Sequence, residues 1–585
     1  MSANKRGRRR FRLTPEEIIE LITADNSDDE EEGLDEEDME VLNEAEEENV
    51  ENVIIERADV THDAIENSNE GKSFNTDCMS NEYLWSRDIS SICSVENIDQ
   101  IEFEALAEKV SSDNFSDPSP VSVYEEVTNF NTLVELLVQE SNRYAAQKGV
   151  VFETNNEEMK AFLGINILMG YHKLPSLRDY WSSDPDMRVS YVANVMPLAR
   201  FEKIRSFLHF SNNEEQLPRK DPNYDRGFKV RALFDHLNAS FQNAISPAEC
   251  QSIDERIIKF KGHHFMKQYI KSKPIKWGFK IWIRAASRSG YVYEMNPYLG
   301  RKEETEIGLG ESVILNLSKT LIRTGCSLYF DNFFTSPRLI QILGEHGLYG
   351  TGTVRSNRKN LPKDLPLEKT MEKGQIDKRQ SQNTHFVRWK DTRSVCMISN
   401  KTSAEETKRV LRKQKGSAQK VSVDVPKMVV DYNQNMGGVD KSDQMKATYA
   451  IDHRSRSKFY LRIFFDLLDT SVVNSYIIYQ KILELRHEKP MKHIEFRQQL
   501  VRGLLGSYSS RLIPSLQQSR KRKYVQSQAK TSTNHIPTWL ESRKRCKVCS
   551  SKKIESRTNV FCHECEAPLC FGSHRNCFET FHKQL

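Results

Sequence analysis

The sequence predicts a protein of several domains: an α/β core set between two helical regions of the chain, followed by a small cysteine-rich module. Three observations lead to this prediction. Apolar residues recur at helical spacing from about residue 125, short β-rich runs replace them from about residue 250, and helical spacing returns after Asp440. Six of the eleven cysteines fall within the last forty residues. A chain of 585 residues has room for all of these parts.

The first 118 residues are predicted to be disordered. Residues 13–56 hold twenty Asp or Glu and no Lys or Arg, a composition too charged to bury a core. Without that block, the 85 basic residues of the chain face only 62 of its 82 acidic ones. A body with this excess of positive charge suits a polyanionic partner. Basic runs at residues 5–10 and 520–523 indicate nuclear localisation.

Apolar stripes predict helices on both sides of the core. Side chains at spacings of three and four residues form four sets: Phe130, Leu133, Leu136 and Leu137; Phe162, Ile165, Leu168 and Met169; Phe201, Ile204, Phe207 and Leu208; and later Phe464, Leu467, Leu468 and Val472. The β-rich runs lie at residues 257–260, 279–283, 291–293 and 327–330. No run reaches the ~20 apolar residues that a membrane helix needs. The N-terminus has no apolar stretch typical of a signal peptide.

Three aspartates stand where strands or helices are predicted to begin or end. Asp254 interrupts a strand-like run, Asp331 follows another, and Asp440 opens a helix with Asp443 on the same face. Carboxylate oxygens suit Mg²⁺, and two such ions ~3.5–4 Å apart can hold the attacking and the leaving oxygen of a phosphoryl displacement. Each aspartate alone also fits a turn or a helix N-cap. Together, within one α/β segment, they predict a metal-dependent phosphoryl-transfer site.

A strongly basic segment adjoins the first aspartate. Residues 259–288 hold nine Lys or Arg and no acidic residue, with aromatic residues interleaved. Positive charge binds phosphates, and aromatic rings can stack on unpaired bases. We expect five lysines of this segment to contact DNA: Lys259, Lys261, Lys271, Lys273 and Lys276. The alternative is a solvated basic hairpin whose Phe279 and Trp282 belong to the core. The histidine pair at 263–264 has no partner at ligand spacing and is expected at the surface.

The C-terminal module has the spacing of zinc ligands. Its pairs read C-x2-C, C-x2-C, C-x3-H and C-x4-H and supply eight ligands: Cys546, Cys549, Cys562, Cys565, Cys570, His574, Cys577 and His582. Four such ligands complete one tetrahedral site, so eight predict two structural zinc ions. The preceding basic residues Arg543, Lys544 and Arg545 favour DNA as the partner. Disulfides in a secreted tail are the alternative, but nothing else in the chain indicates secretion.

The residues of these motifs resemble the piggyBac transposase family. The similar stretches span most of residues 120–480, and the cysteine-rich tail extends the likeness to the C-terminus. They are M-G-Y-H-K-L-P-S-L-R-D-Y-W (169–181), M-P-L-A-R-F-E-K-I-R-S-F-L-H-F-S-N-N (196–213), I-D-E-R-I-I-K-F-K-G (253–262), K-P-I-K-W-G-F-K (273–280), L-Y-F-D-N-F-F-T-S (328–336) and N-M-G-G-V-D-K-S-D-Q-M (435–445). Each stretch is moderately specific, and together they are highly specific.

The resemblance implies a fold for each part of the chain. An RNase H-like catalytic core with an inserted β-rich domain would be flanked by an all-α dimerisation and DNA-binding domain, and a cross-brace zinc module would end the chain. The expected boundaries are 1–118 for the disordered acidic region, 119–249 and 450–506 for the helical domain, 250–358 and 429–449 for the core, 359–428 for the insertion, 507–541 for a basic linker, and 542–585 for the zinc module.

The resemblance also implies metal ligands. Asp254, Asp331 and Asp440 would bind two Mg²⁺ ions, with Asp443 close by as a further catalytic residue. The two zinc ions would be held by interleaved sets. These are Cys546, Cys549, Cys570 and His574 for one ion, and Cys562, Cys565, Cys577 and His582 for the other.

The implied activity is cut-and-paste DNA transposition at TTAA by a nuclear homodimer, without a nucleotide cofactor. Water would cut one strand, and the freed 3′-hydroxyl would attack the opposite strand to form a hairpin, before hairpin opening and strand transfer. Two alternatives remain. One is a host DNA-binding or chromatin protein that keeps the fold but does not transpose. The other is a cross-brace ubiquitin ligase or histone-tail reader.

Overall fold

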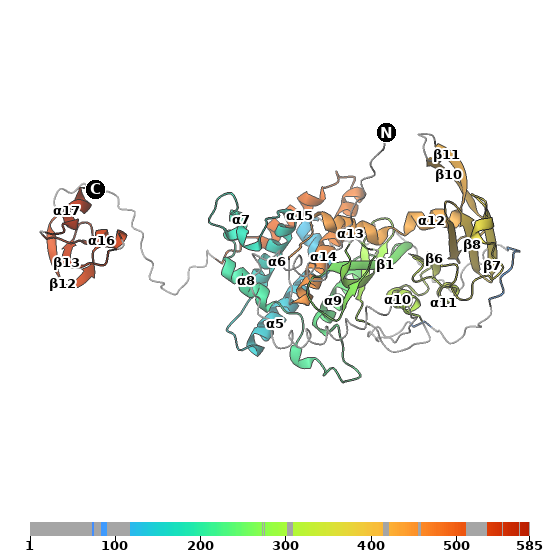
Figure 1. The fold of residues 1–585 in the computed structure, drawn as a ribbon, viewed down its shortest axis with the longest axis horizontal. Coiled ribbons are helices and arrows are strands. Elements are labelled where there is room, and N and C mark those ends of the chain that lie inside the picture. Colours follow the sequence, from blue (N-terminus) through green and yellow to red (C-terminus); the bar gives the residue numbers. More distant parts are fainter. Residues whose placement is uncertain are drawn as a thin grey trace, which may run out of the picture. The chain divides into compact units, whose positions relative to one another are not determined.

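The structure is a computed structural model that describes residues 73–74, 83–89, 118–271, 273, 275–300, 308–413, 420–453, 458–510, 535–552, 554–572 and 574–583. Its contacts divide it into two compact units, one within residues 1–512 and the other within residues 513–585 (Figure 1). Among the described helices, none is both long enough and apolar enough to cross a bilayer.

Helices form the first part of the larger unit and return near its end. They are α4 (Pro120–Thr128), α5 (Phe130–Gln147), α6 (Asn156–Tyr171), α7 (Ser190–Ala193), α8 (Leu198–Phe207), α9 (Phe228–Ala244), α14 (Phe459–Leu485) and α15 (His493–Leu505), with 3₁₀ turns η2 (Leu177–Trp181) and η3 (Asn213–Glu215). Local sequence sets their starts. The Ser119 hydroxyl accepts a hydrogen bond from the Ser122 amide at the start of α4. The stripes predicted around Phe130, Phe162 and Phe201 are confirmed, because α5, α6 and α8 carry them.

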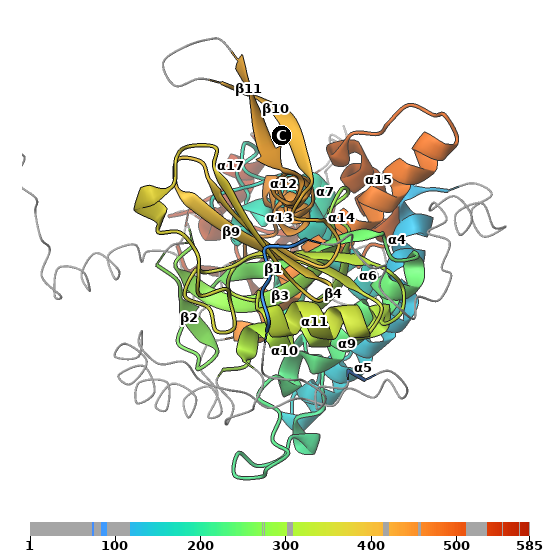
Figure 2. The same ribbon diagram turned by 90° about the vertical axis from the view of Figure 1, so that its right-hand side faces the viewer.

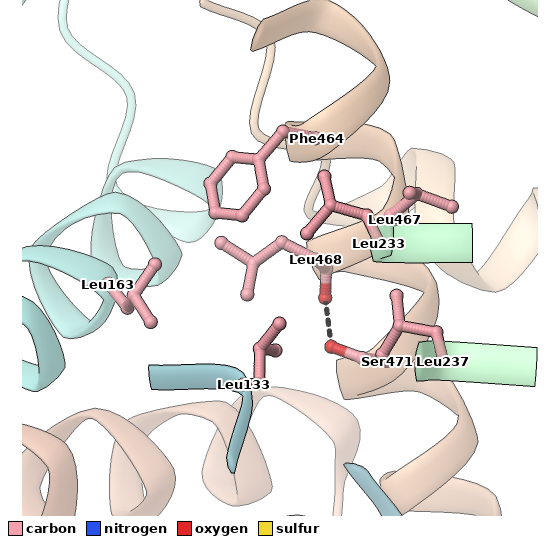
Figure 3. A pocket seen from close by; sticks show the side chains of 8 residues that line it. All are labelled: Leu133, Leu163, Leu233, Leu237, Phe464, Leu467, Leu468 and Ser471. Carbon is pink, nitrogen blue, oxygen red and sulfur yellow. Dashed lines mark hydrogen bonds between the residues drawn. The ribbon is translucent and has the colours of Figure 1, made fainter. Parts of the chain in front are cut away.

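The helices of this region pack around α14. Leucines from α5, α6 and α9 meet its apolar face around a narrow gap, lined by Leu133, Leu163, Leu233, Leu237, Phe464, Leu467, Leu468 and Ser471 (Figure 3). The hydroxyl of Ser471 donates a hydrogen bond to the carbonyl oxygen of Leu468 at 2.7 Å. The gap is therefore part of an apolar core that burial of these side chains stabilises.

A mixed β-sheet follows the first helices in the chain. Its strands are β1 (Cys250–Lys259), β2 (Lys267–Tyr269), β3 (Trp277–Ala286), β4 (Val292–Pro297), β5 (Ser327–Phe330), β6 (Tyr349–Thr353), β7 (Ile376–Ser381), β8 (Thr384–Lys390) and β9 (Ser394–Ser399). Their order is β2-β3-β1-β5-β6-β9-β8-β7, with β4 also paired to β3. β1 and β3 are antiparallel, β1, β5 and β6 are parallel, and β9 is antiparallel to β6. The predicted β-rich runs are confirmed as strands of this sheet.

Helices cover both faces of the sheet (Figure 2). On one face, α13 (Gly438–Thr448) and α14 lie against β1. On the other face, α10 (Leu309–Ser318) lies against β3, and α11 (Pro337–Glu345) lies against β6. The turn η4 (Lys319–Leu321) follows α10. Two apolar cores result. One joins Ile258 and Phe279 to the helical region, and the other joins Ile253 and Trp282 to α10 and α11. Neighbouring residues of β1 therefore face different layers.

The inserted segment differs from the expected separate domain. Within residues 359–428, β7, β8 and β9 join the core sheet, because β9 pairs with β6 and places Ser399 opposite Thr351. The pairing extends β6, which would otherwise be an exposed edge strand. The remaining described elements of the segment are the turn η5 (Glu368–Thr370) and a hairpin of β10 (Thr407–Lys413) and β11 (Lys420–Pro426), next to α12 (Lys427–Asn435). The hairpin forms its own two-stranded sheet and projects from the body (Figure 2).

Parts of the region expected to be disordered pack against the core sheet. Ser86 exchanges backbone hydrogen bonds of 2.8 and 2.9 Å with Gln380 of β7, and the Trp85 indole donates to a backbone carbonyl at 2.9 Å. Phe74 packs against the same core. Aromatic residues account for the difference, since they bury apolar area that the acidic block lacks. The remainder of that prediction lies outside the described residues.

The smaller unit consists of β12 (Pro537–Arg545), α16 (Lys547–Ser551), β13 (Arg557–Cys562), β14 (Ala567–Pro568) and α17 (Cys577–His582). Its strands form a sheet in the order β12-β13-β14. Folded structure thus begins before residue 542, within the stretch 507–541 that was predicted as a linker. Residues 511–534 of that stretch lie outside the described part of the chain.

Candidate functional site

The first two aspartates lie where the parallel pairing of β1 with β5 stops, Asp254 within β1 and Asp331 directly after β5. β1 and β5 pair over four residues each, and the last pair is Ile253 with Phe330. Asp254 and Asp331 are the next residues of the chain, where this pairing stops. Paired strands lie about 4.8 Å apart, so the two carboxylates leave the sheet at adjacent points. The carboxyl ends of parallel strands are where open α/β sheets bind ligands.

Helix α13 carries the third aspartate and packs against β1 next to this point. Asp440 lies in its first turn, and the helix packs on β1 and β3. A Cβ atom at Gly438 would lie only 2.5 Å from Ser252 Oγ and 2.6 Å from the Ala286 carbonyl oxygen, so glycine allows the close approach. The Lys441 ammonium donates hydrogen bonds of 3.0 and 3.3 Å to two carbonyls of the turn after β3. The start of α13 is therefore fixed to the sheet.

Lys273 lies near two of the three aspartates. Its ammonium forms an ion pair with Glu255 at 3.2 Å. Partial burial lowers the pKa of Lys273, but Glu255, Asp254 and Asp440 together raise it above its usual value. A single cation therefore lies within electrostatic reach of side chains from β1 and from α13.

Burial first, and nearby carboxylates second, disfavour the charged forms of Asp254 and Asp331. Burial, and then Glu255, raise the pKa of Asp254 to about 7, and Asp331 adds to the rise. Burial also raises the pKa of Asp331, against the effect of Lys280. Divalent cations favour the charged carboxylates and would offset this penalty.

The donor set fits Mg²⁺, which prefers carboxylate oxygens. In the described residues, however, the oxygens of Asp254, Asp331 and Asp440 do not all lie within 4.8 Å of one another. In this arrangement the three carboxylates therefore do not close around one ion.

Asp443, one turn after Asp440, pairs with a buried arginine. Arg256 of β1 is 2% exposed. Its guanidinium donates hydrogen bonds to four side chains: Asp443, Ser442 at 3.1 Å, Thr470 at 2.7 Å and Asp466 at 3.2 Å. Burial acts to raise the pKa of Asp466, but Lys446 and Arg256 outweigh it and hold the pKa below its usual range. The network attaches α13 to β1 and α14, and it engages the Asp443 carboxylate.

Two residues near the aspartates were not singled out from the sequence. Glu255 follows Asp254 directly, so a second adjacent carboxylate was the available signal. Tyr432 lies on α12, and burial raises its pKa to about 12, with contributions from Asp331 and Asp254. Nothing in the local sequence of Tyr432 indicates this neighbourhood.

The basic segment divides into exposed and buried members. Lys259, Lys261, Lys271 and Lys276 are exposed, as expected of phosphate contacts, whereas Lys273 is half-buried in its ion pair with Glu255. The prediction of a surface histidine pair is right for His263 and wrong for His264. The latter is 3% exposed and stacks on Phe459 with ring centroids 3.8 Å apart. In the smaller unit, the basic residues of β12 are exposed: Arg543, Lys544 and Arg545.

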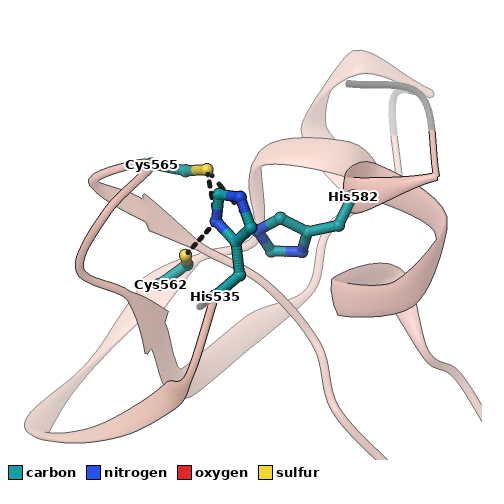
Figure 4. Close-up of side chains that lie close together, drawn as sticks. All are labelled: His535, Cys562, Cys565 and His582. Carbon is teal, nitrogen blue, oxygen red and sulfur yellow. Dashed lines mark hydrogen bonds between the residues drawn. The ribbon is translucent and has the colours of Figure 1, made fainter. Parts of the chain in front are cut away.

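Two groups of four potential zinc ligands come together in the smaller unit. One consists of Cys546, Cys549, Cys570 and Cys577, and the other of His535, Cys562, Cys565 and His582 (Figure 4). Within each group the ligand atoms all lie within 4.8 Å of one another. The Nδ1 atom of His582 is hydrogen-bonded to the Phe578 carbonyl oxygen at 2.7 Å. Its other ring nitrogen, Nε2, faces the ligand group and lies 3.5 Å from Cys565 Sγ. Metal-bound imidazoles are oriented in this way.

The chemistry of both groups fits structural zinc. Cys549 Sγ lies 3.5 Å from Cys577 Sγ and 3.9 Å from Cys570 Sγ. Burial and the neighbouring thiols raise the pKa of Cys577 to about 12, so its thiolate is unfavourable without a cation. At Cys546, in contrast, burial is outweighed by hydrogen bonds, which lower the pKa of that thiol to about 7. Zinc favours thiolates and tetrahedral sets of Cys and His.

The two groups differ from the interleaved sets that the resemblance implies. Cys577 joins the first group, while His574 is exposed and lies in neither. Helix α17 separates Cys577 from His582 by five residues, or about 7.5 Å, so the two residues serve different groups. His535 completes the second group, because β12 pairs with β13 and places Pro537 opposite Cys562. It has no close Cys or His partner in sequence, and spacing alone could not identify it.

Comparisons with known proteins agree with this architecture. Residues 119–476 match the family model described as Transposase IS4. Human PiggyBac transposable element-derived protein 3 is 31% identical over 462 residues, which cover 77% of this chain and 74% of that protein. Human PiggyBac transposable element-derived protein 2 is 30% identical over 447 residues, 74% of this chain and 73% of that protein.

A solved structure shows the same fold. The cryo-EM structure of a piggyBac transposase synaptic complex with hairpin DNA is similar with a TM-score of 0.60 and 24% identity, over 77% of this chain and 95% of that one. The sequence motifs, the mixed sheet with its helical layers, the family model and the human relatives lead to one conclusion: this chain belongs to the piggyBac transposase family.

Proposed function

We propose that this chain is a DNA transposase that cleaves and joins DNA strands at TTAA sites with the help of divalent metal ions. The observation that carries the proposal is the placement of Asp254 within β1 and Asp331 just after β5, where the parallel pairing of these strands stops, with Asp440 on a helix fixed to β1. The order β3-β1-β5-β6 is the arrangement expected of an RNase H-like core.

In this proposal Asp254, Asp331 and Asp440 hold two Mg²⁺ ions, which would supply Lewis acidity toward the phosphate and lower the pKa of the attacking water. Asp443 acts through Arg256 to keep α13 in place. Exposed lysines of the basic segment bind the DNA backbone.

The reaction needs no nucleotide cofactor. Water attacks the phosphorus atom, the P–O3′ bond breaks, and the released 3′-hydroxyl attacks a phosphate of the opposite strand. In the second step a P–O3′ bond of the opposite strand breaks, so that a hairpin closes and the flanking DNA leaves with a 3′-hydroxyl. Hairpin opening and strand transfer repeat the same displacement chemistry.

We infer further that the smaller unit holds two zinc ions and binds DNA through Arg543, Lys544 and Arg545. A basic strand beside two metal-stabilised sites is suited to phosphate contacts. The chain would act in the nucleus as a homodimer, in keeping with a reaction that handles two DNA ends.

An in vitro cleavage assay tests the proposal. The full-length chain is incubated with Mg²⁺ and duplexes that carry candidate terminal repeats ending in TTAA. Wild type is expected to nick these duplexes, Asp331→Asn is expected to lose the activity, and Asp186→Asn, which alters an exposed aspartate in the helical region, should retain it. Equal activity of wild type and Asp331→Asn would contradict the proposed site.

A second candidate is a nuclear DNA-binding protein that keeps the fold but does not transpose. The observation that favours it is the human relatives, whose names describe them as derived from transposable elements. Tight, zinc-dependent DNA binding without cleavage of any candidate end would support this second function.

A further inference from the structure

The aromatic residues of the basic segment 259–288 differ widely in burial. Phe260, Phe279 and Trp282 are at most 4% exposed and belong to the apolar cores. Tyr269 and Trp277, in contrast, are 49% and 44% exposed. Large rings left open to solvent mark a surface that gains stability when a partner covers it.

Tyr269 and Trp277 form one surface at the end of the β2–β3 pair. They are partners in the antiparallel register, and their ring centroids lie 4.7 Å apart with 46° between the ring planes. The Lys267 ammonium lies 5.1 Å from the centre of the Trp277 ring. Ile275 nearby in the chain is 40% exposed. Because β2 is at the edge of the sheet, no further described strand covers this side.

The charge around this aromatic pair is positive. Lys271 and Lys276 lie between the two strands in sequence and are exposed. Lys273, in the same connection, reaches Glu255 beside the first aspartate. Residues 259–288 carry nine basic residues and no acidic one. A partner that combines flat rings with phosphate groups complements this surface, whereas a protein of mixed charge does not.

Strand register places the pair on the same face of the sheet as the first aspartate. Asp254 is opposite Ile283, and Trp277 is six residues from Ile283 along β3, so their side chains point to one face. Six residues of strand span about 20 Å. This length corresponds to about six base steps of duplex DNA at 3.4 Å each. Phe279 and Ile281, which lie between the two positions on this face, are 1% and 2% exposed beneath the helical layer, so the aromatic pair is a surface separate from the aspartates.

We propose that Tyr269 and Trp277 form a base-stacking site for an unpaired nucleotide of DNA, with the surrounding lysines on its phosphates. Duplex DNA keeps its bases stacked on each other and offers only its backbone to these lysines. Unpaired DNA is therefore the form that this chemistry selects. The link between this nucleotide and a DNA end under cleavage rests on the proposed function, whereas the stacking site itself does not.

Fluorescence anisotropy with two DNA probes tests the site. The full-length zinc-loaded chain is titrated, without added magnesium, against a labelled single strand of about 12 nucleotides and against its blunt duplex. Trp277→Ala and Tyr269→Ala are expected to weaken single-strand binding about tenfold each. Both should leave duplex binding within about twofold, and Trp277→Phe should recover part of the single-strand affinity, since base stacking on a phenyl ring persists.

Two controls separate stacking from charge. Lys276→Ala removes a phosphate contact and is expected to weaken both DNA forms alike, with a smaller salt dependence. Tyr191→Ala removes an equally exposed ring from α7 and should change neither affinity.

Several outcomes would overturn the stacking site. If the alanine variants lost equal affinity for the single strand and the duplex, the surface would contact only the DNA backbone. Unchanged single-strand affinity in both alanine variants would exclude stacking. Unchanged DNA affinity together with an altered oligomeric state would identify a second copy of the chain as the occupant. Should Trp277→Ala fail to fold, Tyr269→Ala carries the same test. The binding assay measures no cleavage and is independent of the cleavage assay. If Trp277 supported single-strand binding in a chain that cuts no DNA, the proposed function would be contradicted and the stacking site would still hold.

Discussion

The two units of this chain prepare for metal ions in opposite ways. In the larger unit, Asp254, Asp331 and Asp440 are carried by strands and a helix whose cores are filled with apolar side chains. In the smaller unit the ligands are themselves most of the core. The cysteines Cys546, Cys549, Cys562 and Cys577 are buried there beside a few apolar residues: Val560, Ala567, Leu569 and Phe578.

The difference shows what each kind of site requires. Carboxylates that, under the proposed function, would admit DNA and exchangeable ions can remain apart, because the sheet and its helices hold them in place. In the smaller unit, the thiols and imidazoles take the place of an apolar core, so they have to lie close enough to bind one ion together. Within each group their ligand atoms lie within 4.8 Å of one another. The comparison therefore predicts that metal removal unfolds one unit and leaves the other folded.

Loss of a zinc ligand is expected to have the largest effect. Cys549→Ser removes one of four ligands from a site that would contribute on the order of 10–16 kcal/mol to folding. Native mass spectrometry should count two zinc ions in the wild type and one in the variant. Hydrogen exchange should show loss of protection in β12, β13 and α17 and unchanged protection in the sheet of the larger unit.

A matched pair of histidines sharpens this test. His535 lies in the second ligand group and His574 lies in neither. His535→Ala is expected to lose one zinc ion, and His574→Ala should keep both. Loss of zinc in His574→Ala but not in His535→Ala would support the interleaved sets that the resemblance implies. It would contradict the ligand groups seen in the structure.

Local patterns were sufficient to find the three aspartates, because each one interrupts or ends a run whose period is visible in sequence. They were not sufficient for the polar network that holds α13. Arg256 meets Asp443 and Asp466, which lie 187 and 210 residues further along the chain. A buried partner at such a distance leaves no periodic signal, so the sequence predicts Asp443 as a further catalytic residue and gives no indication of its pairing with Arg256.

Strand pairing explains the other differences. The segment 359–428 contains strands, as predicted, but sequence does not tell which edge they extend, and β9 pairs with β6. His535 becomes a ligand only through the pairing of β12 with β13. His264 is buried because α14 brings Phe459 over it. In each case a contact between distant parts of the chain decides what a local pattern leaves open.

Replacement of Arg256 is expected to have the next largest effect. Arg256→Met leaves the Asp443 carboxylate without this partner and removes one of the cations near Asp466, in a site where the arginine is 2% exposed. Breaking one side of a buried ion pair costs about 3–5 kcal/mol. Urea unfolding of the larger unit should show this loss, and the loss should be the same with and without Mg²⁺.

An exposed ion pair supplies the control. Arg409 is 82% exposed at its pair with Asp424 on the β10–β11 hairpin. Because such pairs contribute about 0–1 kcal/mol, Arg409→Met should change stability little. A loss for Arg256→Met that is no larger than for Arg409→Met would mean that the polar network does not hold α13. A loss that appears only with Mg²⁺ would mean that the larger unit also relies on metal.

The smallest expected effect concerns acid. Burial lowers the pKa of His264 to about 3, with Lys229 and Arg219 adding to the shift. Since the unfolded chain then binds a proton that the folded chain rejects, stability is present above pH 6.5 and is lost as the pH falls below it. For one such histidine the loss between pH 7.5 and pH 5.5 is about 1.4 kcal/mol. Urea unfolding measures the free energy of unfolding at the two pH values. From pH 7.5 to pH 5.5 this free energy should fall by about 1.4 kcal/mol less in His264→Gln than in the wild type. In His263→Gln, which changes the exposed neighbour, it should fall as much as in the wild type. If the free energy of unfolding fell equally in the two variants, other groups would cause the acid sensitivity of the larger unit. The buried His264 would then give no support to a core that excludes charge without a metal.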